Sequence, residues 1–137
     1  MEINYVLVAV AAVAQFILGA VWYSPLMFGK IWMRIMGMAQ MSKEELQRLQ
    51  KAMSPFYGLQ FVLTLFMTFS FANFMAYATN LDVYHAAFWL WSGFVVPVQI
   101  SAVIWGSTPK KFWLWQCFIM TSMQLAAIML MAWILSM

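Results

Sequence analysis

The chain has 137 residues, of which 66% are hydrophobic and only 8% are charged, and its formal net charge is +3. This composition excludes a soluble globular fold and leaves no room for a second, water-soluble domain, so we expect a single membrane domain over residues 1–137. The basic residues lie next to predicted membrane spans, where attraction to anionic lipid headgroups accounts for them. We therefore expect membrane lipids, and no nucleic acid, as partners.

Four uncharged stretches are each long enough to cross a bilayer, which takes about 20 apolar residues. The predicted spans cover residues 3–23, 55–79, 84–105 and 112–135. The expected fold is all-α, an integral membrane four-helix bundle. All 7 Lys and Arg residues fall in the first and third loops, which face the same side. The positive-inside rule places both loops in the cytoplasm and both termini outside, as in a multi-pass inner-membrane protein.

The first span carries a stripe of small and polar residues at helical spacing, including Val8, Ala11, Gln15 and Gly19. Small residues let membrane helices approach one another closely. We expect this stripe to face the rest of the bundle.

The loop after the first span is predicted to hold two helices. In residues 26–38, Lys30 and Arg34 are spaced i and i+4 among large apolar residues, which is typical of a helix lying on the cytoplasmic membrane surface. Lys110 and Lys111 of the third loop join them as expected lipid headgroup contacts. Ser42 and Glu45 have the spacing of a capping box, which predicts a separate helix over residues 44–53 before Pro55 opens the second span.

The second span has two polar faces. Tyr57, Gln60, Thr64 and Thr68 line one side of its cytoplasmic half, whereas Ser70, Asn73 and Tyr77 line the opposite side of its outer half. One bundle of four helices buries one such face easily. The second face predicts a partner, which is either another copy of the chain or a different membrane protein.

Three glutamines, Gln15, Gln99 and Gln124, fall near the middle of the first, third and fourth spans, and Ser92 and Thr121 add hydroxyl groups. These side chains either form a polar patch that binds a neutral or cationic solute, or hold the helices together by hydrogen bonds. The second interpretation is favoured, at about 0.6 to 2 kcal/mol per contact. Pro97 in the third span predicts a kink, because it leaves the carbonyl of Gly93 without its usual amide partner.

The sequence predicts no catalytic, cofactor-binding or metal site. No Asp, Glu, Lys or Arg falls inside a span, which disfavours carriers driven by a buried carboxylate. Asp82 and His85 are too few ligands for a metal ion. No residue pattern marks an activated nucleophile, so we do not expect an enzyme.

One motif in the first half of the chain consists of Trp22, Tyr23, Ser24, Pro25, Phe28, Gly29 and Trp32, and a second group in the other half consists of Gly93, Phe94, Pro97, Pro109, Lys111 and Phe112. The first motif resembles the signature of a bacterial membrane family known as domain of unknown function 1761, and the second group is similar to the second half of the family pattern. The resemblance implies a four-span inner-membrane protein and supplies no established activity.

Three functional classes follow from these observations. The first is a homo-oligomeric transport or permeation protein for a small neutral or cationic solute. The alternative is a noncatalytic accessory or assembly subunit of a larger membrane complex. A lipid-modifying enzyme ranks last, because no acid, base, metal or nucleophile constellation is visible.

Overall fold

The computed structural model describes residues 2–137, and within them every regular element is a helix. The elements are α1 (Tyr5–Trp22), α2 (Gly29–Ile35), α3 (Lys43–Tyr77), α4 (Val83–Leu90), the π-helical turn η1 (Trp91–Val95), α5 (Val96–Ile104), the 3-10 turn η2 (Lys110–Phe112) and α6 (Trp113–Leu135). Among the described residues, four helical stretches are long and apolar enough to cross a membrane: α1, α3, the continuous run Val83–Ile104, and Lys110–Leu135. The protein therefore has the helices of a multi-pass membrane protein, and most predicted span ends agree with them within two residues.

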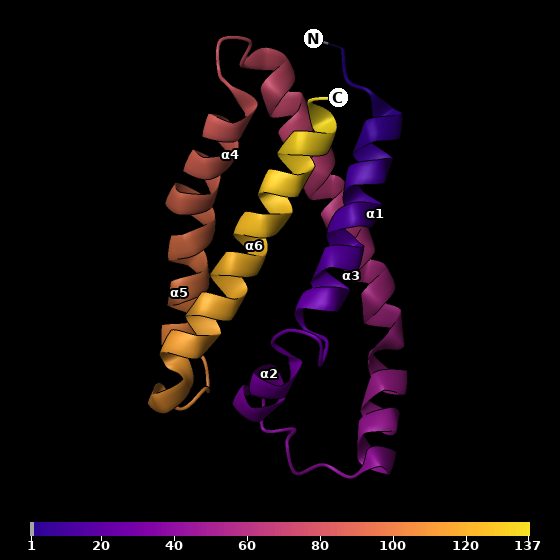
Figure 1. Ribbon diagram of the computed structural model, residues 1–137, viewed down its shortest axis with the longest axis vertical. Helices are drawn as coiled ribbons and strands as arrows, with labels where there is room; N and C mark the ends of the chain where they lie inside the picture. Colours follow the sequence, from indigo (N-terminus) through magenta and orange to yellow (C-terminus); the bar gives the residue numbers. More distant parts are fainter. Residues whose placement is uncertain (1) are drawn as a thin grey trace.

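Helices α1 and α6 form the centre of the bundle (Figure 1). Helix α1 packs against α6 on one side and α3 on the other, and α4, η1 and α5 all pack along α6. Small residues make these contacts close: Ala11 and Ala12 of α1, Ala87 of α4 and Ala132 of α6 are all fully buried. The stripe predicted on the first span does face the bundle, with Val8, Ala11 and Gln15 buried and Gly19 against Met123.

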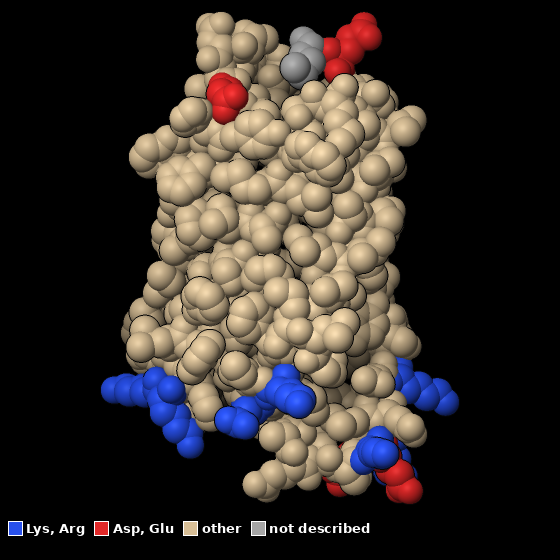
Figure 2. Space-filling view, viewed as in Figure 1, with Lys and Arg blue, Asp and Glu red and all other residues tan. Residues whose placement is uncertain are grey.

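Charged side chains lie at the two ends of the molecule. Figure 2 shows Lys and Arg side chains around one end and a wide uncharged band above them. In the chain these basic residues belong to α2, the start of α3, and η2. We call this the basic end, and both termini lie at the opposite end (Figure 1).

The second predicted span is part of a much longer helix. The separate helix predicted over residues 44–53 is wrong, because α3 runs without a break for 35 residues and contains Pro55. Pro55 has no N–H for the carbonyl oxygen of Lys51, and the hydroxyl of Ser54 donates to that oxygen instead, at 2.8 Å. The predicted capping box of Ser42 and Glu45 is present at the start of this helix.

The segment with Lys30 and Arg34 is helical as predicted, although α2 is only 7 residues long. It lies at the basic end beside α6, with Gly29 and Ile35 buried and both charged side chains exposed. Its position on a membrane surface stays a prediction.

Candidate functional site

The best-defined polar group inside the bundle is the amide of Gln15, which lies between α1 and α3 and is 2% exposed. Its Nε2 donates to the carbonyl oxygen of Ala11 at 3.1 Å and to Oγ1 of Thr68 at 2.8 Å. The Thr68 hydroxyl donates its one proton to the carbonyl of Thr64, so towards Gln15 it can only accept. This fixes the amide: Nε2 faces Thr68, and Oε1 is buried without a donor among the described residues.

The Gln15–Thr68 hydrogen bond is part of a row of hydrogen-bonded polar residues, which we call the polar seam. It consists of Gln60, Thr64, Thr68 and Gln15. The Thr64 hydroxyl donates to the Gln60 carbonyl at 2.9 Å and accepts from the Gln60 amide at 3.3 Å. Thr64 and Thr68 are buried, whereas Gln60, nearer the basic end, is exposed. The polar face predicted on the first half of the second span is therefore largely the α1–α3 contact, although Tyr57 remains exposed.

Two further buried amide oxygens have no donor in the described part of the chain. They belong to Gln99 on α5 and Gln116 on α6, two helices that pack against each other. At about 1.5 Å per residue, Gln15, Gln99 and Gln116 lie roughly 10, 8 and 5 Å from the helix ends on the basic side. Sequence reasoning missed Gln116 as a site residue, although it lies in the same broad polar stripe of the fourth span as Gln124.

The other predicted site residues lie elsewhere or bond locally. No hydrogen bond between described residues joins any two of Gln15, Gln99 and Gln124, and Gln124 is half-buried without a hydrogen bond of its own. Ser92 donates to the carbonyl of Trp89 and Thr121 to that of Cys117. That these side chains line one solute site stays a prediction.

Two tryptophans attach α6 to its neighbours. The indole N–H of Trp22 on α1 donates to the carbonyl of Ile119 at 3.2 Å, and that of Trp91 on η1 donates to the carbonyl of Thr121 at 2.8 Å. Ile119 and Thr121 lie on opposite sides of a helix, so α6 is fixed from both flanks. Trp91 begins the π-helical turn, which ends two residues before Pro97, where the sequence predicts a kink.

The backbone of the Trp22–Trp32 motif forms the tight turn between α1 and α2. The amide of Phe28 donates to the carbonyl of Trp22 at 3.1 Å, and that of Gly29 to the carbonyl of Ser24 at 2.9 Å. The hydroxyl of Ser24 donates to the carbonyl of Val21 at 2.6 Å. Pro25 lies within the turn. A Cβ atom on Gly29 would lie 2.5 Å from the carbonyl carbon of Ser24, so the turn requires glycine at this position.

Aromatic contacts hold this turn on α6. The rings of Trp22 and Phe28 are 5.5 Å apart, and Phe28 in turn meets Phe118 of α6 at 6.0 Å. Tyr23 meets Trp32 of α2 edge-on, with 4.8 Å between centroids. The motif that the family resemblance singled out is therefore a folding element in this structure, in which each aromatic residue packs against another.

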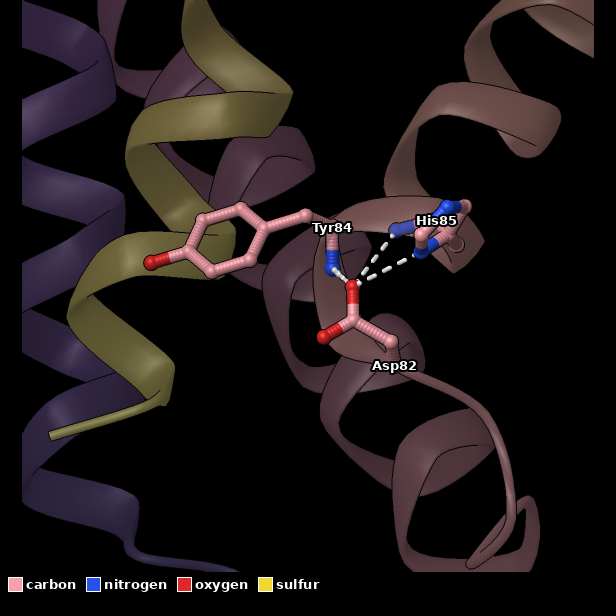
Figure 3. A network of polar contacts seen from close by, with 3 residues as sticks. All are labelled: Asp82, Tyr84 and His85. Carbon is pink, nitrogen blue, oxygen red and sulfur yellow. Dashed lines mark hydrogen bonds and ion pairs between the residues drawn. The ribbon is translucent and has the colours of Figure 1, made fainter.

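Asp82 and His85 form the cap of α4 at the end opposite the basic end (Figure 3). One carboxylate oxygen of Asp82 accepts from the backbone amides of Tyr84 and His85, each at 3.0 Å, and lies 3.1 Å from Nδ1 of His85. The backbone hydrogen bond from His85 is the main cause that lowers the pKa of Asp82. Both side chains are exposed. This pair is explained by helix capping alone.

The predicted partner face lies outside the bundle. Tyr77 is 89% exposed, Ser70 is exposed and Asn73 is partly exposed. The hydroxyl of Ser70 donates to the carbonyl of Phe66 and the amide of Asn73 to that of Phe69, both within α3. At the basic end, Lys110 and Lys111 lie over the rings of Trp113 and Phe112.

The sequence profile of one family, described as protein of unknown function (DUF1761), matches residues 6–136. Neither the curated proteins nor the solved structures give a match. Because the matched segment covers nearly the whole chain and includes the complete turn from Trp22 to Trp32, the chain belongs to the DUF1761 family.

Proposed function

We propose that the protein is a homo-oligomeric inner-membrane protein through which a small neutral or cationic solute crosses the membrane. The observation that carries this proposal is the set of buried amide oxygens of Gln15, Gln99 and Gln116, which accept no hydrogen bond from the described chain. A buried acceptor without a partner costs about 1 to 3 kcal/mol, and lipid tails cannot supply a donor. A solute with N–H or O–H groups can donate hydrogen bonds to these oxygens as it passes.

The chemistry of these groups limits the classes of solute that the protein could bind. An amide oxygen accepts hydrogen bonds or contacts a cation, and it repels an anion. In Gln15 the Nε2 group is already bound to Ala11 and Thr68, so only the acceptor remains. No Asp, Glu, Lys or Arg lies within the spans predicted over residues 3–23, 55–79, 84–105 and 112–135. The solute would therefore move down its own gradient or with the membrane potential, without coupling to a buried carboxylate.

A noncatalytic accessory or assembly subunit is the second candidate. Two observations favour it: the family motif serves the fold itself, and α3 carries a polar face outside the bundle at Ser70, Asn73 and Tyr77. A subunit of this kind would present that face to a different membrane protein.

Flux into proteoliposomes tests the proposal. The purified protein should speed entry of methylammonium or urea at least tenfold over empty liposomes, and it should leave acetate entry unchanged. Gln15→Leu or Gln99→Leu should abolish most of this flux. Gln124→Leu makes the same chemical change at an amide that has no buried unpaired oxygen, so it should retain most of it.

Three results would count against transport. Flux equal to that of empty liposomes would contradict the assigned role of the buried acceptors. So would equal losses of flux in the Gln15→Leu and Gln124→Leu variants. Stoichiometric retention of another membrane protein during mild purification, together with absent flux, would favour the accessory subunit.

A further inference from the structure

The side of α3 that faces away from the polar seam is exposed along most of its length, and we call it the bare stripe. Its exposed residues are Leu59, Val62, Phe66, Phe69 and Tyr77, and Asn73 among them is partly exposed. Phe69 lies at the edge of this face, where its ring stacks on that of Tyr5 of α1 with 6.2 Å between centroids. Thr68 and Asn73 are five residues apart, which places them about 140° apart around the helix. The bare stripe and the seam are therefore separate faces.

The bare stripe has the spacing of a helix that packs against another helix. Leu59, Phe66 and Asn73 are seven residues apart, and Val62 and Phe69 repeat the same interval three residues after Leu59 and Phe66. This is the a and d pattern of two helices in left-handed contact. Asn73 then occupies an a position, where an asparagine in parallel two-stranded coiled coils pairs with its equivalent and fixes the register.

An exposed apolar stripe alone would not indicate a protein partner, since lipid tails can cover it. Helix α1 also has one, with Val6, Val10, Val13 and Ile17 exposed. The stripe on α3 differs from it by the amide of Asn73. That amide donates one N–H to the carbonyl of Phe69 at 2.9 Å, and its second N–H and its Oδ1 have no hydrogen bond among the described residues. Lipid tails offer neither a donor nor an acceptor.

We propose that α3 packs against α3 of a second copy around a two-fold axis normal to the membrane, with the two Asn73 amides hydrogen-bonded to each other. Each amide supplies one donor and one acceptor, so a two-fold axis satisfies both groups at once. This inference rests on the proposed homo-oligomer and names its interface. Because the polar seam lies on another face of α3, each subunit holds its own set of buried acceptors.

Disulfide crosslinking in native membranes tests this interface. The single cysteine is first removed by Cys117→Ser. Phe66→Cys is then compared with Phe94→Cys on η1, because the two native side chains are almost equally exposed, at 67% and 69%. After oxidation, Phe66→Cys should give a covalent dimer at least tenfold more abundant than Phe94→Cys does. Equal dimer yields at the two positions, or none at Phe66, would overturn the proposal.

The role of Asn73 is measured in the same background. Asn73→Leu should lower the Phe66→Cys dimer several-fold while leaving membrane insertion intact, and an unchanged yield would overturn the amide pairing. Flux measured on the same preparations separates the two proposals. Flux without α3 crosslinking would contradict this interface but support the transport function. Crosslinking without flux would support the interface but contradict transport.

Discussion

Gly29 shows how one residue in the family motif determines the path of the chain. The amide of Gly29 bonds to Ser24, and its Cα lies so close to the preceding turn that a Cβ would meet backbone atoms of both Ser24 and Tyr23. Backbone atoms cannot move aside as the end of a side chain can. The aromatic residues around the turn, Trp22, Phe28 and Trp32, keep their contacts only if this turn stays closed.

Replacing Gly29 with alanine should therefore destabilise the protein by about 2 kcal/mol or more, the range seen when a side chain is forced into a well-packed site. The matched control is Gly58→Ala on α3, where an added Cβ has nothing within 4 Å. There the change should be neutral or stabilise by about 0.5 to 1 kcal/mol, since alanine favours a helix over glycine. Unfolding in detergent measures both variants, and similar stability of the two would refute the close approach.

Helix α3 shows how a local bond changes a whole element. Proline inside a helix removes one backbone hydrogen bond, which is why a break at Pro55 is the natural expectation from sequence. The Ser54 hydroxyl replaces the missing donor at the carbonyl of Lys51, and the helix continues. The span lengths could be predicted because bilayer thickness sets them. The continuity of α3 could not, because it depends on the rotamer of one serine.

Removing that hydroxyl should loosen α3 at the proline. Spin labels at the exposed positions Leu49 and Leu63, on either side of Pro55, report the distance between the two halves. With Ser54→Ala the distribution of this distance should become broader, because the carbonyl of Lys51 loses its donor. Adding Pro55→Ala should restore a narrow distribution, since alanine brings back the backbone N–H. A narrow distribution in Ser54→Ala alone would show that the hydroxyl does not support the helix.

At the scale of the whole molecule, charge and packing were predictable to different degrees. The confinement of every Lys and Arg to two loops predicts one basic end, and the structure places them there (Figure 2). The order of the helices around α1 and α6 was not predictable, because an apolar face suits lipid and protein equally. Gln15 could be placed on a packing face from its small neighbours, whereas its pairing with Thr68 needed the relative position of α1 and α3.

The basic end predicts the orientation of the molecule in the membrane. Short loops rich in Lys and Arg stay in the cytoplasm, so Lys30, Arg34, Lys110 and Lys111 should face inward and both termini outward. A reporter enzyme that folds only outside the cytoplasm should be active when fused after Met137 and inactive when fused after Gln40, between α2 and α3. A fluorescent protein that matures only in the cytoplasm should give the reverse pattern at both positions. Cytoplasmic activity after Met137 would invert the topology and place the buried acceptors of Gln15, Gln99 and Gln116 nearer the outer surface, so the solute would meet them first from outside.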